Sequence, residues 1–171
     1  MQLVELINKS DEAPYYLKQN AVLWKTSIQD WMKEKNQKNR STKDILRKSE
    51  TLVKQGTSYQ EDSSDRGGEI YFLRALSDLH LILAGALEKP ELGEALYLTG
   101  RSYEAVKDLS IWTLHENYYE SCIRSVPHSD WSGKCYKRLE ESILLGYTGS
   151  AGVSIPPDVQ SRLEEYKKLA L

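Results

Sequence analysis

The stretch "IYFLRALSDLHLILAGALEKPELGEALYLTGRSY" (residues 70–103) decides the fold class of this chain. Its first half comes closest to an unbroken apolar run, but Arg74, Asp78 and His80 interrupt it. The run therefore falls short of the ~18 to 20 apolar residues that a membrane span needs. Apolar residues on nearly all sides predict instead a buried helix over about 69–87. We expect His80 to be a core residue of this helix, with its hydrogen bonds satisfied.

The same periodicity extends in both directions. Pro90 begins the next helix, because the first helical position has an N–H without a partner inside the helix. Toward the N-terminus, Ser41 is expected to cap a helix that ends near Gly56, with Asp44 completing a variant capping box. Before it, apolar residues at steps of four and three draw one stripe along a further helix, made of Leu17, Ala21, Trp24, Ile28 and Trp31.

These patterns predict an all-α fold of about seven helices and no convincing strand. Short connections in the second half favour antiparallel neighbours, and two helices per ~34 residues is the period of a helix-turn-helix array. We expect one domain over the whole chain, 1–171. Its expected parts are an N-terminal hairpin (15–56), a polar loop (57–68), a repeat core (69–145), a Gly/Ser/Pro loop (146–157) and a C-terminal capping helix (158–170).

The composition narrows the class of function. The formal net charge is −2, so no overall field attracts nucleic acid. Eleven Tyr and four Trp suit shallow cores and binding grooves, because each buries a ring and keeps a polar tip in water. The basic run 33–55 is typical of a solvated surface, with contact to an anionic partner as the alternative. Residues 1–12 lack the basic start and apolar centre of a signal peptide.

Both cysteines lie in "YYESCIRSVPHSDWSGKCY" (118–136). The spacing of Cys122 and Cys135 matches no zinc motif, and His128 is the nearest base for a catalytic thiol, so we expect neither a metal site nor a catalytic residue here. If 118–126 and 130–145 form a helical hairpin, the two thiols are equally distant from its turn, and we expect them to face each other across it. Two arrangements stay open: van der Waals contact between small buried residues, or a disulfide, which requires Cα atoms within ~7 Å.

Two other motifs fail the requirements of the sites that they resemble. "HENYY" (115–119) has Tyr119 where a zinc metalloprotease has its second His. "GYTGSAG" (146–152) lacks the Lys-Ser/Thr of a phosphate-binding loop and the strand that should precede it. We therefore expect no cofactor and no enzymatic activity.

Residues 94–128 resemble a tetratricopeptide repeat. The matching positions are Leu96, Gly100 and Tyr103 in "EALYLTGRSY" and Tyr119, Cys122 and Pro127 in "YYESCIRSVP". They are the large, small and aromatic positions of the first helix and the aromatic, small and closing positions of the second. The chain departs from the pattern at Thr99, at His115 and in about three extra residues around 107–112.

This resemblance implies a right-handed array of antiparallel helical hairpins, which presents a concave surface to partners and has no chemistry of its own. The implied function is a non-catalytic interaction or scaffold module that binds a peptide or helix of a protein partner in a groove. The residues expected to line this groove are the polar and aromatic ones on the paired helices: Tyr97, Arg101, Glu104, Asn117 and Arg124.

More broadly, residues 66–169 are similar to uncharacterised helical proteins of Gram-negative cell envelopes. This similarity implies a periplasmic or envelope location, which would favour the disulfide, with the cytoplasm as the alternative. Two other functions stay open. One is a small-ligand-binding protein with a Tyr/Trp-lined pocket under the 57–68 or the 146–157 loop. The other is a structural subunit of a larger envelope assembly, for which a broad exposed apolar patch would be the sign.

Overall fold

The apolar stretch that decides the fold class forms helix α4 (Glu69–Leu83) in the computed structural model, which describes residues 2–34, 40–60, 66–106, 113–150 and 152–171. Nine of the 15 residues of α4 are buried, so the predicted central helix is confirmed. It ends four residues earlier than the predicted limit at 87, and residues 84–88 lead into the next helix.

The rest of the described chain is almost entirely helical. Its elements are α1 (Gln2–Lys9), α2 (Tyr15–Glu34), α3 (Thr42–Ser58), α5 (Lys89–Ala105), α6 (Leu114–Ser125), α7 (Asp130–Gly146), β1 (Thr148–Gly149), β2 (Gly152–Val153) and α8 (Pro157–Ala170). The all-α class is confirmed. The two strands pair antiparallel over two residues each, inside the predicted Gly/Ser/Pro loop.

The described residues form eight helices where the sequence analysis expected seven, because α1 was missed. This helix spans only eight residues, about two turns, so its apolar positions repeat too few times for sequence periodicity to identify it. It buries none of these residues. The cap of α3 was predicted correctly, since the Ser41 side chain accepts a hydrogen bond from the Asp44 N–H. Part of the predicted polar loop (61–65) and part of the predicted repeat core (107–112) lie outside the described residues.

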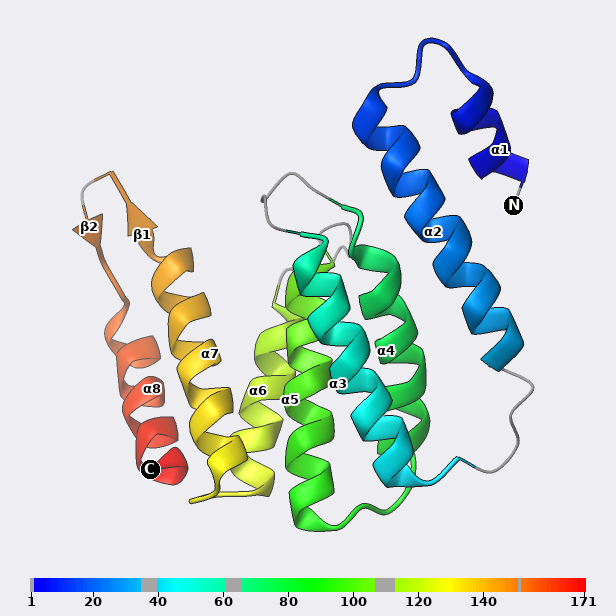
Figure 1. Cartoon of the computed structure of the whole chain (residues 1–171). Coiled ribbons are helices and arrows are strands. Elements are labelled where there is room, and N and C mark those ends of the chain that lie inside the picture. The colour runs from blue at the N-terminus through cyan, green and yellow to red at the C-terminus, as the bar shows by residue number, and fades with distance from the viewer. Residues whose placement is uncertain (1, 35–39, 61–65, 107–112, 151) are drawn as a thin grey trace.

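Helices α3 to α8 stack as consecutive antiparallel neighbours (Figure 1). Contacts also join helices two apart in the chain: α3 with α5, α5 with α7, and α6 with α8. Helices two apart in such a stack run in the same direction, so α5 and α7 form a parallel pair with α6 packed against both. Helices α1 and α2 lie at the other end of the molecule, where α2 packs on α4.

Two apolar clusters fill this stack, and α5 belongs to both. One cluster joins α5 to α6, α7 and α8 through residues such as Leu96, Tyr119 and Leu139. The other joins α5 to α3 and α4 through residues such as Leu98 and Phe72. Each large apolar side chain that is fully buried stabilises the fold by roughly 1.5–3 kcal/mol. Helix α5 is therefore the element that couples the two halves of the stack.

Gly100 permits the closest helix contact in this region. A Cβ atom built on Gly100 would overlap the ring of Tyr119, a side chain that is fully buried between α5 and α6. The ring atoms cannot withdraw easily, because protein cores are packed at crystal-like density. Gly133, in the first turns of α7, has no heavy atom within 4 Å of the same position.

We expect G100A to lower the free energy of unfolding by about 1–3 kcal/mol, because the added methyl group overpacks the contact with Tyr119. Urea denaturation followed by circular dichroism measures this change. G133A is the matched control, since it adds the same methyl group to a helix where space is open; it should leave stability unchanged or raise it by up to about 1 kcal/mol. Equal effects of the two variants would contradict the packing argument.

Candidate functional site

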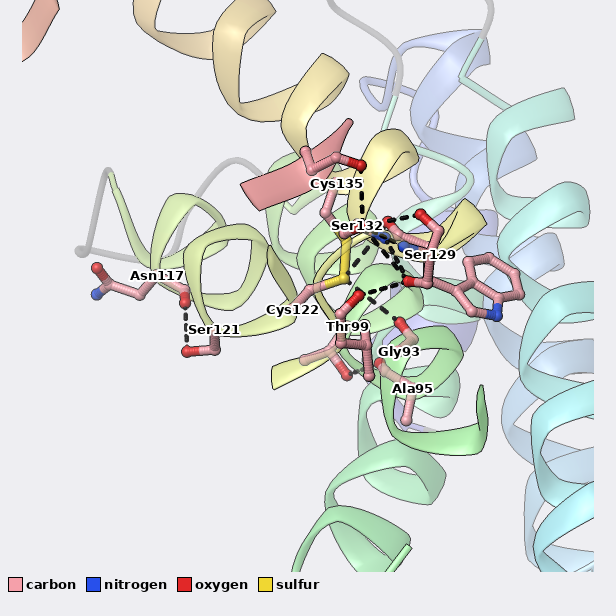
Figure 2. The surroundings of a disulfide bond; sticks show 12 residues. Gly93, Ala95, Thr99, Asn117, Ser121, Cys122, Ser129, Ser132 and Cys135 are labelled. Atoms are coloured by element: carbon pink, nitrogen blue, oxygen red, sulfur yellow. Dashed lines mark hydrogen bonds between the residues drawn. A yellow bond between two sulfur atoms is a disulfide. The ribbon is translucent and has the colours of Figure 1, made fainter. Parts of the chain in front are cut away.

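A disulfide joins Cys122 on α6 to Cys135 on α7 (Figure 2). The two Cα atoms are 6.4 Å apart, and both residues are fully buried. Of the two arrangements that the sequence left open, the structure therefore contains the disulfide. The Cys122 sulfur lies 3.5 Å from the carbonyl oxygen of Trp131 and 3.7 Å from that of Gly93. The bond thus lies where α5, α6 and α7 meet.

Hydrogen bonds hold the turn between α6 and α7 from several sides. His128 has a positive φ of 55°, and its N–H donates to the Leu169 carbonyl at 2.8 Å. Ser129 and Ser132 form a reciprocal capping box at the start of α7. The Ser132 hydroxyl also lies 3.2 Å from the carbonyl of Ala170. The turn is therefore anchored to the end of α8, and the oxidised sulfurs provide no thiolate for catalysis or metal binding.

One continuous band of aromatic and charged side chains runs along α5 and α7, and we call it the α5–α7 face. Its members are Tyr97, Arg101, Glu104, Trp131 and Arg138. The rings of Tyr97 and Trp131 are 5.6 Å apart between centroids, and Arg101 Nη1 donates to the Tyr97 hydroxyl at 3.4 Å. Three of the five groove residues expected from the sequence therefore lie together on this face.

Glu104 is the centre of the charged end of the α5–α7 face. Its carboxylate accepts a hydrogen bond from the Tyr119 hydroxyl at 2.6 Å and from Nε and Nη2 of Arg138. Burial and the neighbouring Glu104 carboxylate raise the pKa of Tyr119 well above its ordinary value, so the phenol remains a donor. Burial alone would lower the pKa of Arg138, but Glu104 outweighs it and raises that pKa. The network therefore keeps fixed charges at neutral pH.

Two further charges border the aromatic end of this face. The Lys134 ammonium lies 4.0 Å from the centroid of the Trp131 ring, within the range of a cation–π contact. Burial raises the pKa of Glu94, and the nearby carboxylate of Glu50 on α3 adds to the shift. The residues around Trp131 thus carry both signs of charge.

A hollow of about 340 Å³ lies at the end of the α5–α7 face, open to solvent. Its walls are mainly apolar and include Pro90, Val126, Pro127 and Trp131, with Lys89 and Asp130 among the charged lining residues. A Cβ built on Gly93 would come 2.8 Å from the Cβ of Trp131, so the backbone of α5 holds this side chain closely. The hollow is therefore bounded by groups that packing keeps in place.

The other two expected groove residues lie elsewhere. Asn117 is exposed on α6, and its carbonyl accepts a hydrogen bond from Ser121. Arg124 donates to the Tyr166 hydroxyl at 2.7 Å, with its guanidinium 5.0 Å from the ring centroid. Arg124 thus belongs to the contact between α6 and α8, and the structure does not bring it together with the α5–α7 face.

His80 departs from the expectation of a core residue, because its side chain is exposed. Its Nε2 lies 2.8 Å from the Tyr103 hydroxyl, and its ring packs near Tyr103 and Tyr118. Partial burial under these rings lowers the pKa of His80. The residue lies on the outer side of α4, where sequence periodicity could not separate a buried position from an aromatic surface cluster.

His115, Ser142 and Glu116 form a small polar cluster between α6 and α7. His115 Nε2 is 2.7 Å from the Ser142 hydroxyl oxygen, and that hydroxyl donates to Glu116 at 2.8 Å. Because the single hydroxyl proton points to Glu116, the imidazole must donate to Ser142 rather than accept from it. This arrangement does not activate a nucleophile in the way that a serine–histidine pair does.

A cluster of charges between α2, α3 and α4 was not predicted from the sequence. Glu34, Arg40, Lys48, Arg74 and Asp78 contact one another there, and we call them the ionic clasp. The available signal was the pair Arg74 and Asp78, one turn apart inside the most apolar helix. Buried charges in such a position require partners, and those partners come from segments that sequence periodicity does not connect.

Comparisons with protein-family models, with curated proteins and with solved structures found no match to this chain. In the part of the chain that the structure describes, no helix combines the length and apolar character needed to cross a membrane. The same residues include no group of three or more His, Cys, Asp or Glu that could hold a metal ion. The site must therefore be interpreted from its own geometry.

We expect the disulfide to stabilise the fold by about 2–4 kcal/mol. The test is urea denaturation of the oxidised protein with and without reductant, in which reduction should shift the midpoint to lower urea. The double variant C122S/C135S is the control, because it should show the lower stability and no response to reductant. A thiol count of two in unreduced, denatured protein from its native source would contradict this prediction.

Proposed function

We propose that this protein is a non-catalytic interaction module that binds a peptide or a helix of another protein on the α5–α7 face. The observation that carries the proposal is the continuous band from Trp131 through Tyr97 and Arg101 to Arg138. Trp, Tyr and Arg are the residues that most often dominate the binding energy of protein interfaces. Here they lie on two parallel helices, which suits a ligand that lies along them.

The contacts among these side chains support this function because they hold the face in place before any partner arrives. Tyr97 packs on Trp131, and Glu104 holds Arg138 in a network with the buried Tyr119. A side chain that is already ordered loses less conformational entropy on binding. The apolar hollow beside Trp131 provides room for a side chain of the partner at one end of the face.

The alternative of an enclosed small-ligand site has less support. The hollow beside the 146–157 loop, one of the two places expected for such a pocket, is open to solvent, and Tyr136 is the one aromatic residue among its described lining residues. The alternative of a subunit in a larger assembly is favoured by the exposed apolar side chains of α1 and α2, such as Leu3 and Tyr15. The disulfide supports a location in an oxidising compartment, which agrees with the proposed envelope location.

Photo-crosslinking from the face tests this proposal. A photoreactive residue at position 101 should capture a discrete partner in the native cell, and the same residue at Lys168, exposed on α8, should not. Y97A should reduce capture about fivefold or more, because an interface anchor typically contributes more than 1 kcal/mol. K168A serves as the matched surface control. Equal capture from both positions, or capture that Y97A leaves unchanged, would contradict the proposal; circular dichroism confirms that each variant is folded.

A further inference from the structure

The N-terminal arm, which consists of α1 and α2 (2–34), is attached to the molecule differently from every other helix that the structure describes. Neither apolar cluster includes a described residue of α1 or α2. Helix α2 buries only Ala21 and Ser27, although it is 20 residues long. Of the predicted apolar stripe, Leu17 is exposed, and Trp24, Ile28 and Trp31 are half-buried. Hydrophobic burial therefore contributes less to holding the arm than it does elsewhere.

Much of the apolar surface of the arm faces water. Six large apolar side chains are each more than half exposed, namely Leu3, Leu6, Tyr15, Tyr16, Val22 and Met32. Figure 1 shows the two helices at the edge of the molecule, where α1 packs on α2. This surface does not attach the arm to the rest of the chain.

The polar contacts of the ionic clasp provide much of the attachment, beside the half-buried Trp24, whose Nε1 donates to the Arg66 carbonyl at 3.4 Å. Arg74 on α4 donates to Ser27 at 2.8 Å and to Glu34 at 2.9 Å, both on α2. Lys48 on α3 donates to Glu34 at 2.5 Å and to Asp78 at 3.1 Å. Glu34 thus receives hydrogen bonds from two helices of the stack at once.

The clasp has an excess of positive charge that the arm reduces. Without α2, its members are three cations (Arg40, Lys48 and Arg74) and the carboxylate of Asp78, which Arg40 holds through two hydrogen bonds of 2.7 Å. The Arg74 side chain is only 6% exposed, and its Nε has no hydrogen-bond partner. Glu34 adds the second carboxylate. The stack therefore attracts Glu34 electrostatically, and the attraction is strong because Arg74 is nearly excluded from water.

Solvent reaches the Glu34 end of this contact. The Glu34 side chain is 30% exposed, and the Lys48 side chain is 23% exposed. Burial alone would raise the pKa of Glu34, but the hydrogen bonds from Lys48 and Arg74 outweigh it and lower that pKa. Glu34 is therefore ionised at neutral pH, and salt ions can weaken its attraction to the two cations.

We propose that the arm is a releasable element: the ionic clasp holds α1 and α2 on the stack, and salt or loss of the Glu34 charge releases them while α3 to α8 stay folded. Release uncovers Arg74 and Lys48 and leaves the clasp with three cations against one carboxylate. This inference does not depend on the function proposed for the α5–α7 face, which lies on other helices.

Amide hydrogen exchange of the full-length chain tests the proposal, because exchange reports the free energy of local opening helix by helix. In E34Q we expect exchange in α2 to accelerate about tenfold or more, since Arg74 loses its charged partner, while exchange in α5, α6 and α7 stays unchanged. In the wild type, raising NaCl from about 0.01 M to about 1 M should have the same effect, because the Debye length falls from ~30 Å to ~3 Å.

E12Q is the matched control. It removes the same charge from the same arm at an exposed position outside the clasp. We expect E12Q to exchange like the wild type and to keep the response to salt, whereas E34Q should lose most of that response. The proposal is overturned if E34Q and E12Q exchange alike, if α2 opens only together with α5 to α7, or if salt leaves the exchange of α2 unchanged.

Discussion

The arrangement of α5, α6 and α7 depends on the burial of Tyr119. Its ring occupies the space that Gly100 leaves on α5, and a single methyl group on that glycine would collide with it. Its hydroxyl cannot remain without a partner in such a place, and the Glu104 carboxylate accepts a hydrogen bond from it. Glu104 then holds Arg138, so one buried phenol links the packing of the core to the charged end of the α5–α7 face. A surface that depends on the core in this way keeps its shape for as long as the core is intact.

The helices at the two ends of the stack are attached to it by different kinds of interaction. At the C-terminal end, α6, α7 and α8 share a continuous apolar cluster, and the disulfide fixes the hairpin behind Trp131. At the N-terminal end, α2 meets α4 through charges and partly buried aromatic rings. Apolar contacts carry no charge that salt could screen, whereas the attraction between exposed charges falls as ionic strength rises. The same chain therefore combines a part whose geometry is constant with a part whose attachment depends on conditions.

Much of this architecture could be predicted from the sequence. Periodicity located α4 and the helices after it, the capping pattern of Ser41 was correct, and the positions of Cys122 and Cys135 about their turn identified them as facing residues. The other contacts join residues that lie far apart in the sequence, and local sequence patterns do not predict them. Sequence spacing does not reveal that Glu34 meets Arg74, forty positions away, or that Arg124 pairs with Tyr166 on α8. It also could not separate the exposed His80 from the buried Asp78 two positions earlier, because helix periodicity defines faces and not the depth of each residue within them.

The contact pattern of the stack explains how the two parts can behave independently. In a stack of helical hairpins each hairpin contacts only the adjacent ones, so stability is close to a sum of local terms. Helix α2 contacts α4, while Trp131, Tyr97 and Arg138 lie on α5 and α7. The helices α3 and α4 retain their own apolar cluster with α5, whether or not α2 is in place. Since Arg74 is nearly buried between these elements, what the arm contributes to Arg74 and Lys48 is mainly charge compensation, and any carboxylate that reached the same two cations would provide it.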